Sequence, residues 1–263
     1  MMTITKYFHH QGNIDALTDR HPAFARFKHS TIRRSAEFKW LNKSTNTIEW
    51  QAVISFFGKS GYGKSSTVNA FFGQPILETS DVAACTGRCD CLDFQISDEY
   101  FLSFADYPGI GENEYKDKEY LEMYKNFLAS SNIVVYVLRA DMRDYAIDEQ
   151  AFKTVFPCDE DKRKVIFAVN CCDKIEPVRR TYSTTPSAEQ MKNIEKKLQK
   201  LRSIFQPHNP IIPYSAQTTW NLEALAETIV NVAEKVGDIT FHASKKPFYS
   251  GAIPWDSIRP TRT

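Results

Sequence analysis

The residues best suited to chemistry lie between Ile54 and Thr67, in the stretch I-S-F-F-G-K-S-G-Y-G-K-S-S-T. Its spacing G-x-x-x-x-G-K-S is typical of loops that hold the phosphates of a nucleoside triphosphate. Glycines let successive backbone N–H groups turn toward phosphate oxygens, and the Lys64 ammonium adds a positive charge beside them. The residues expected to bind the nucleotide here are Gly58, Lys59, Ser60, Gly61, Tyr62, Gly63, Lys64, Ser65 and Ser66. A plain Gly/Ser turn between two elements is the alternative interpretation.

A carboxylate and a glycine follow an apolar run at 100–105. Asp106-Tyr107-Pro108-Gly109 has the form D-x-x-G, in which Asp106 reaches the shell of a bound Mg²⁺ through water and the Gly109 N–H meets the terminal phosphate. The same four residues also make a good turn. Their chemical interpretation therefore depends on the phosphate loop upstream.

A magnesium ion that bridges phosphates needs oxygen ligands. The Ser65 hydroxyl is one candidate, Asp106 is a second, and Thr86 is a third, with Thr79 as its rival and an ordinary loop threonine as the alternative interpretation. We therefore expect Ser65, Thr86 and Asp106 to be the metal ligands. The expected catalytic set is Lys64, Thr86, Asp106 and Gly109.

A motif suited to a purine base follows the apolar run at 164–169. Asn170-Cys171-Cys172-Asp173 has the form N-x-x-D, and a carboxylate at Asp173 can accept two parallel hydrogen bonds from guanine. Adenine would leave that carboxylate unpaired, at a cost of about 1–3 kcal/mol. Further along, Ser215-Ala216 offers a backbone N–H to the guanine carbonyl oxygen. If Asp173 is only a helix cap, an ATP site is the alternative.

Alternating strand and helix patterns surround these motifs. The predicted fold class is α/β, a three-layer domain with a mostly parallel six-stranded sheet and helices on both faces, and with ligand loops at the carboxyl ends of the strands. The expected strands are 48–57, 90–97, 100–105, 132–138, 164–169 and 210–213. The expected helices are 64–72, 116–129, 147–155, 187–205 and 220–235.

Composition excludes several broad classes of protein. The 263 residues carry 33 Lys and Arg against 32 Asp and Glu, so no overall field draws the chain to nucleic acid or to an anionic membrane. The six cysteines match neither the paired zinc pattern nor a secreted disulfide framework, although Cys85, Cys89 and Cys91 together form a weak metal candidate. The most apolar run, 133–138, is too short to span a bilayer. We expect a cytoplasmic protein.

Three segments are expected along the chain. Residues 1–46 form an N-terminal extension, which we expect to be helical and packed on the next domain, with a nucleic-acid surface as the alternative because aromatic and basic residues alternate there. Residues 47–236 form the nucleotide-binding domain. Residues 237–263 form a tail rich in proline and basic residues, which is too short for a folded RNA-binding domain.

Taken together, these motifs resemble those of the small GTPases of the Era, TrmE and EngA group, and most closely the YfjP-like, Era-like 50S ribosome-binding GTPases of bacteria. The resemblance covers about residues 47–235. The stretches that carry it are G-K-S-G-Y-G-K-S-S, A-C-T at 84–86, D-Y-P-G-I-G-E at 106–112, R-A-D-M-R-D-Y-A-I-D-E at 139–149, N-C-C-D-K-I-E-P at 170–177 and Y-S-A at 214–216.

The resemblance implies binding of GTP or GDP with Mg²⁺, slow hydrolysis of GTP, and a molecular switch that acts on an unknown protein or ribosomal partner or through self-association in the GTP state. Direct RNA binding is left open. A nucleotide-dependent binding module with little turnover is the alternative function. Multiple-turnover release of phosphate separates the two.

Three residues depart from the pattern of these families. Cys171 stands where the guanine motif usually has a lysine, which predicts weaker guanine binding. Gly61 stands where an asparagine supports potassium activation in parts of the group, so we predict no potassium dependence. Ile110 stands where many regulatory GTPases have a glutamine that orients the attacking water. The sequence leaves that role open among Arg88, Glu112, Glu114 and Glu119.

Overall fold

The computed structural model describes residues 9–11, 14–33, 39–42, 47–79, 89–97, 99–178 and 183–242. Its centre is a sheet in the order β1-β5-β6-β4-β7-β8-β9, with β3 paired to β4 outside this path. The strands are β1 (His9–Gln11), β3 (Lys39–Asn42), β4 (Thr47–Gly58), β5 (Asp90–Ser97), β6 (Tyr100–Asp106), β7 (Ile133–Arg139), β8 (Val165–Asn170) and β9 (Ile212–Pro213). All neighbouring pairs are parallel except β5 with β6 and β3 with β4.

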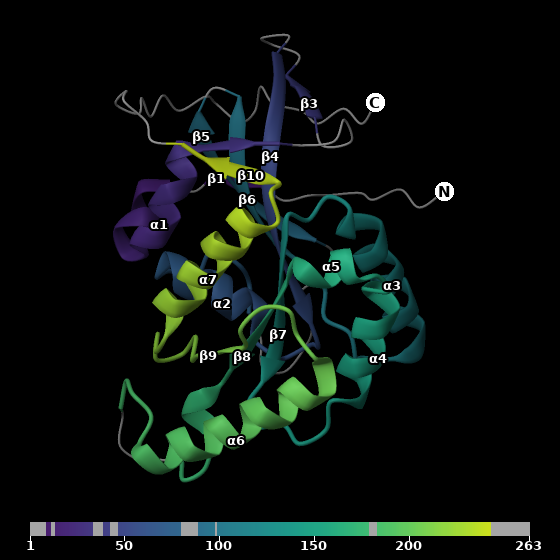
Figure 1. Ribbon diagram of the computed structural model, residues 1–263, viewed down its shortest axis with the longest axis vertical. Helices are drawn as coiled ribbons and strands as arrows, with labels where there is room; N and C mark the ends of the chain where they lie inside the picture. The colour runs from purple at the N-terminus through teal and green to yellow at the C-terminus, as the bar shows by residue number, and fades with distance from the viewer. Residues whose placement is uncertain are drawn as a thin grey trace.

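Helices cover both faces of this sheet, so the fold has three layers (Figure 1). One face carries α1 (Ile14–Arg20), the 3-10 helix η1 (Pro22–His29), α2 (Lys64–Phe72) and α7 (Leu222–Lys235). The other carries α3 (Glu114–Leu128) and α4 (Ala146–Val155), with α6 (Ala188–Phe205) packed beside α4. The expected α/β class, with a mostly parallel sheet and helices on both faces, is confirmed.

The six strands and five helices expected from the sequence are all present, with small shifts at their ends. β9 is shorter than the expected run at 210–213, because Pro210 and Pro213 have no N–H to give to a strand ladder. The helix α5 (Asp159–Arg163) was not expected. Its sequence D-E-D-K-R buries no residue, so no hydrophobic period marks it.

The N-terminal part of the chain adds strands that sequence analysis did not predict. β1 lies parallel to β5 at one edge, and β3 pairs antiparallel with the first half of β4, so the sheet has eight strands rather than six. A separate two-stranded sheet joins β2 (Ser30–Ile32) to β10 (Ile239–Phe241). Strands of three or four residues give too little alternation to be recognised.

Aromatic side chains tie the N-terminal helices to the central sheet. Phe24 from η1 contacts the rings of Phe71 in α2 and Phe104 in β6 edge-on, at centroid distances of 5.4 and 5.7 Å. Phe24 and Phe27 are fully buried. This end of the chain therefore shares the hydrophobic core of the domain.

The motifs lie where the strand directions predict. β4, β6, β8 and β9 run parallel in one sheet and end at Gly58, Asp106, Asn170 and Pro213, so the loops that follow them meet at one edge of the sheet. Thr86 lies outside the described residues. Within the described part of the chain, no helix is both long and apolar enough to cross a bilayer.

Candidate active site

The phosphate loop connects β4 to the first turn of α2 and takes a shape that glycine permits. Gly63, directly before α2, has φ of 86°, and a Cβ at this position would lie 2.3 Å from the Asn170 side-chain nitrogen. Gly61 has φ of 73°. A left-handed backbone and a close neighbour both favour glycine at position 63. The loop therefore delivers the chain to the N-terminus of α2, where free backbone N–H groups favour an anion.

Lys64 begins α2 and is buried at the base of this loop. Its ammonium donates to the backbone carbonyl of Lys59 at 3.1 Å. Burial lowers the pKa of the ammonium, while the carboxylates of Asp106, Glu112 and Asp148 act in the opposite direction. A buried cation is thus held beside the loop by acidic groups that surround it.

Ser65 and Asp106 come together as the sequence predicts. The Ser65 hydroxyl donates to one carboxylate oxygen of Asp106 at 2.5 Å, and the other carboxylate oxygen is buried without a hydrogen-bond partner. Burial raises the pKa of Asp106 to about 6. A hydroxyl and a carboxylate with an unpaired buried oxygen are hard ligands that suit Mg²⁺. The third expected ligand, Thr86, lies outside the described residues, and Thr79 is exposed.

The D-x-x-G segment lies directly on the phosphate loop. The Ser60 N–H donates to the Ile110 carbonyl at 2.8 Å, and the Ile110 N–H donates to the Gly58 carbonyl at 3.3 Å. A Cβ on Gly109 would lie 2.4 Å from the Ser60 nitrogen and 2.7 Å from the Lys64 ammonium. Only glycine, which has no Cβ, lets the D-x-x-G segment come this close to the phosphate loop. The Gly109 backbone therefore lies beside the Lys64 ammonium.

Tyr124 in α3 hydrogen bonds to both the D-x-x-G segment and the phosphate loop. Sequence analysis did not predict this role. The Tyr124 hydroxyl lies 2.6 Å from the Pro108 carbonyl and 3.3 Å from the Gly58 carbonyl. Its ring stacks on Phe57 at 4.0 Å between centroids. Ile110 is 1% exposed, so its side chain packs inward. This conformation places no side chain of Ile110 where it could orient a water molecule.

The base end of the site is a hydrogen-bonded network around Asn170. Its side-chain nitrogen donates to the Tyr62 carbonyl at 3.1 Å, and its side-chain oxygen accepts the Ala216 N–H at 3.0 Å. The Ser215 hydroxyl donates to Asp173 at 2.6 Å. The structure thus brings together the four residues expected at the base, and Asn170 connects them to the phosphate loop.

Two details of the base end modify the expectation. We expect a backbone N–H of Ser215-Ala216 to bind the guanine carbonyl oxygen, but here the Ala216 N–H donates to Asn170 and the Ser215 N–H donates to the Trp220 carbonyl. Cys171 has a left-handed backbone, and burial raises the pKa of its thiol to about 11. At neutral pH a short uncharged side chain therefore stands where the related guanine motifs have a lysine.

A buried acid beneath the phosphate loop is a further feature that sequence analysis missed. Asp148, in the first turn of α4, is fully buried and accepts a hydrogen bond from the Tyr62 hydroxyl at 3.3 Å. Its other carboxylate oxygen has no partner, and burial raises its pKa to about 7. Arg139, at the end of β7, reaches the Gly61 carbonyl at 3.3 Å and pairs with Asp141. The sequence signal that could have revealed this acid is the run of charged residues that follows the apolar strand β7.

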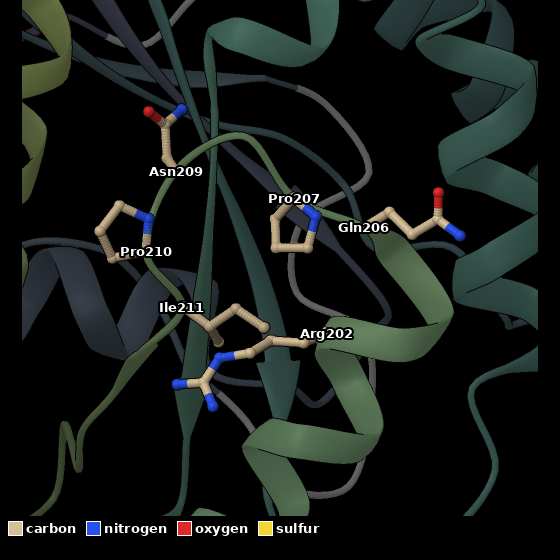
Figure 2. A pocket seen from close by; sticks show the side chains of 6 residues that line it. All are labelled: Arg202, Gln206, Pro207, Asn209, Pro210 and Ile211. Carbon is tan, nitrogen blue, oxygen red and sulfur yellow. The ribbon is translucent and has the colours of Figure 1, made fainter.

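Other candidate sites do not compete with this one. A surface pocket lies between the end of α6 and the start of β9 (Figure 2), and none of its lining residues belongs to a motif: they are Arg202, Gln206, Pro207, Asn209, Pro210 and Ile211. The thiols of Cys89 and Cys91 lie 3.7 Å apart and buried, and Cys85 lies outside the described residues. Among the described residues, no three or more His, Cys, Asp or Glu side chains come together as a cluster that could hold a metal ion by themselves.

Comparison with known sequences places a family model on the same segment. Residues 53–171 match the model described as "50S ribosome-binding GTPase". The protein YfjP of Escherichia coli strain K12, which is uncharacterized, is 34% identical over 191 residues, covering 72% of this chain and 65% of that protein. The chain thus spans just under two thirds of the length of this relative.

Solved structures show the same fold. A structure of Era in complex with MgGDPNP and a segment of 16S ribosomal RNA superposes with a TM-score of 0.57 at 21% identity, covering 78% of this chain and 62% of that one. A structure from a study of the chloroplast translocon components atToc33 and psToc159, in which dimerization is important for GTPase activity, has a TM-score of 0.57 at 17% identity, covering 83% and 93%. At these identities the likeness concerns the fold.

Proposed function

We propose that the protein, whose residues 53–171 match the family model described as "50S ribosome-binding GTPase", binds GTP and GDP with Mg²⁺ and hydrolyses GTP to GDP and phosphate. The observation that carries the proposal is the Asn170 side chain, which bonds both to the phosphate loop at Tyr62 and to the base end at Ala216. A phosphate site and a guanine motif are thereby held in one rigid unit. This is the arrangement that a guanine nucleotide requires.

In the proposed reaction the residues of this chain position and stabilise, because phosphoryl transfer depends on alignment and charge neutralisation. Backbone N–H groups from Lys59 to Lys64 hold the phosphates, and the Lys64 ammonium stabilises negative charge on the oxygens of the transferred group. Ser65 and Asp106, with Thr86, would hold the magnesium ion, and the ion would supply further charge neutralisation. Gly109 brings a backbone N–H to the terminal phosphate.

Selectivity for guanine rests on Asp173. One of its oxygens accepts the Ser215 hydroxyl, which orients the carboxylate, and its side chain remains partly exposed to a base. A carboxylate accepts from the guanine ring N–H and amino group and has no such partners on adenine. The ATP alternative requires Asp173 to be only structural.

Turnover by the isolated protein is proposed to be slow, and the protein is proposed to act as a switch for a partner. The inward packing of Ile110 supports this, because the residue after D-x-x-G offers no polar group to the attacking water. The dimer-dependent activity of the chloroplast relatives makes self-association our first choice of partner, with a ribosomal partner second. A binding module with little turnover is favoured by the same Ile110 observation.

We also propose the division into an N-terminal extension (1–46), a GTPase domain (47–236) and a tail (237–263). The buried Phe24 supports an extension that packs on the domain. The five described cysteines are free, which supports a cytoplasmic location where thiols stay reduced.

Binding of fluorescent GDP and GTP analogues to the purified protein with Mg²⁺, in competition with ATP, tests the proposal. We expect displacement by GTP and GDP but not by ATP, and loss of that preference in Asp173→Asn. Multiple-turnover phosphate release then separates the GTPase from the binding module. Equal displacement by ATP and GTP would overturn the guanine assignment.

A further inference from the structure

The GTPase reaction needs a polar group beside the attacking water, and Ile110 does not supply one. Three of the four charged candidates are described by the structure. The side chain of Glu114 is 86% exposed and pairs with Lys118 along α3, and Glu119 lies further along the same helix. The side chain of Glu112, in contrast, is only 16% exposed. Of these three glutamates, Glu112 is the one with a buried carboxylate oxygen that has no hydrogen-bond partner.

The turn that carries Glu112 is fixed against the phosphate loop. The Asp117 carboxylate accepts the N–H groups of Gly111 at 2.7 Å and Glu112 at 3.3 Å. A Cβ on Gly111 would lie 2.9 Å from the Lys59 side chain. These contacts hold the backbone of Glu112 close to the loop, three residues after Gly109.

The carboxylate itself is only half satisfied. One oxygen accepts the Lys116 ammonium at 2.9 Å, and the other is buried without a hydrogen-bond partner. The carboxylate is near enough to Lys64 to raise the pKa of that buried ammonium. An unpaired buried acceptor costs free energy unless a ligand or a water molecule fills it. Lys64 and Gly109, which are neighbours, mark the place where the terminal phosphate would lie.

We propose that Glu112 is the residue that orients the attacking water, a catalytic role that it fills with its unpaired carboxylate oxygen in place of the side chain missing at Ile110. This inference rests on the proposed GTPase activity and adds the group that activity requires. Glu112 is thus specific to the hydrolysis step and contributes little to holding the nucleotide.

The chemistry balances without a further reactant. The carboxylate accepts a hydrogen bond from water, the water oxygen forms a bond to the γ-phosphorus, and the bond from that phosphorus to the β–γ bridging oxygen breaks. The bonding electrons leave with GDP. The proton of the water passes through the carboxylate to the released phosphate, so Glu112 ends unchanged.

A merely structural role is the competing account, in which Glu112 only fastens the start of α3 through its pair with Lys116. The two accounts predict different effects of replacing Lys116. If the ion pair matters, Lys116→Met should reproduce the defect of Glu112→Gln. If the free oxygen matters, Lys116→Met should hydrolyse GTP at least as fast as the wild type.

The test is single-turnover hydrolysis of GTP together with the Kd for a non-hydrolysable GTP analogue. We expect Glu112→Gln to slow hydrolysis about 10²-fold, within the range for a positioned acid–base group, with Kd changed less than about threefold. Glu112→Asp should recover part of the rate. Glu114→Gln, which alters the exposed neighbouring pair, is the matched control and should match the wild type.

Each other outcome overturns the inference. Hydrolysis by Glu112→Gln at the wild-type rate removes Glu112 from the reaction while the GTPase proposal stands. Equal defects in Glu112→Gln and Lys116→Met assign it to structure. Wild-type protein that binds GTP and releases no phosphate overturns both the activity and this role.

Discussion

At the base end of the site Asn170, Asp173 and Ser215 all hydrogen bond to the protein, whereas at the phosphate end three carboxylates keep a buried oxygen without a partner. Those three are Asp106, Glu112 and Asp148, and the negative charge of each raises the pKa of the buried Lys64 ammonium. The described residues contain one other such atom, on His21 in the N-terminal segment.

The base end of the site is therefore complete before a nucleotide binds, and the phosphate end is not. A network whose members satisfy one another is rigid and keeps its geometry without ligand. Buried charges without partners are costly, and a bound phosphate and metal ion would relieve that cost. The base end should therefore tolerate conservative changes better than the phosphate end.

The largest effect should come from Lys64→Ala. Loss of the buried Lys64 ammonium, which lies beside Gly109, removes charge-assisted bonds worth about 1.5–3 kcal/mol each, so we expect GTP affinity and hydrolysis to fall about 10²- to 10³-fold. Titration with a fluorescent GTP analogue measures the loss of affinity. Lys125→Ala, at an exposed ion pair on α3, is the control. Affinity within threefold of the wild type would contradict the importance of the phosphate end.

Asp148→Asn should change how stability depends on pH in nucleotide-free protein. The carboxyl has its ordinary pKa of 3.8 in the unfolded chain and about 7 when folded. A raised folded pKa means that wild-type stability is fully present below pH 3.8 and declines as the pH rises toward 7. The free energy of unfolding of the Asp148→Asn variant has no such decline. By pH 8 the variant should therefore gain at most about 4 kcal/mol of stability relative to the wild type.

Urea unfolding from pH 5 to pH 8 measures the part of this gain that falls above pH 5, at most about 3 kcal/mol, as the change in the stability difference between the two proteins. The groups around Asp148 include Lys59, which lowers its pKa, and Asp144, which raises it, with Tyr62, Tyr136 and Tyr145 nearby. Asp144→Asn is the control, because that carboxylate is exposed. A difference that does not vary with pH would show that Asp148 is not held neutral by burial.

Gly109→Ala should separate the two nucleotides. The added Cβ would meet the Ser60 backbone at 2.4 Å and the Lys64 ammonium at 2.7 Å, so the D-x-x-G segment must move away at a cost of about 1–3 kcal/mol. We expect GTP affinity to fall about 10- to 100-fold and GDP affinity to fall less, because GDP has no terminal phosphate. Gly237→Ala, where a Cβ meets nothing but the left-handed φ of 73° is still strained, is the control for a loss of stability away from the site. Equal losses for both nucleotides would contradict the assigned role.

The sequence allows the fold and the motif positions to be predicted because each depends on local patterns. β7 is a run of buried apolar residues, and α6 has a clear helical period behind a Ser187 capping box. Strand direction then brings Asp106 and Asn170 to one edge. Local patterns, in contrast, do not reveal that Tyr124 crosses from α3 to hold Pro108, because that contact depends on how a helix packs over the sheet.

The carboxylate oxygens that lack hydrogen-bond partners could not be predicted from the sequence for the same reason. Glu112 and Glu114 are two residues apart and identical in type, yet the side chain of Glu112 is mostly shielded from solvent and that of Glu114 is exposed. The backbone N–H groups of Gly111 and Glu112 donate to Asp117 and so fix the turn that carries Glu112, whereas Glu114 lies in α3 and pairs with Lys118. Burial of a single side chain in a loop is a tertiary property, and no sequence period reports it.

The smallest effect should come from the base end, at Cys171→Lys. A lysine stem over the base would add apolar contact, but its ammonium would enter a neighbourhood that holds Arg139 and Lys174 as well as Asp141 and Asp173, so the charges nearly cancel. We expect guanine affinity to rise about three- to tenfold, about 1 kcal/mol, without a change in the preference over ATP. Cys171→Met separates the two contributions, because it supplies a stem without charge. A lysine variant that binds GDP no better than the wild type would show that Asn170 and Asp173 alone set the affinity of an already complete base site.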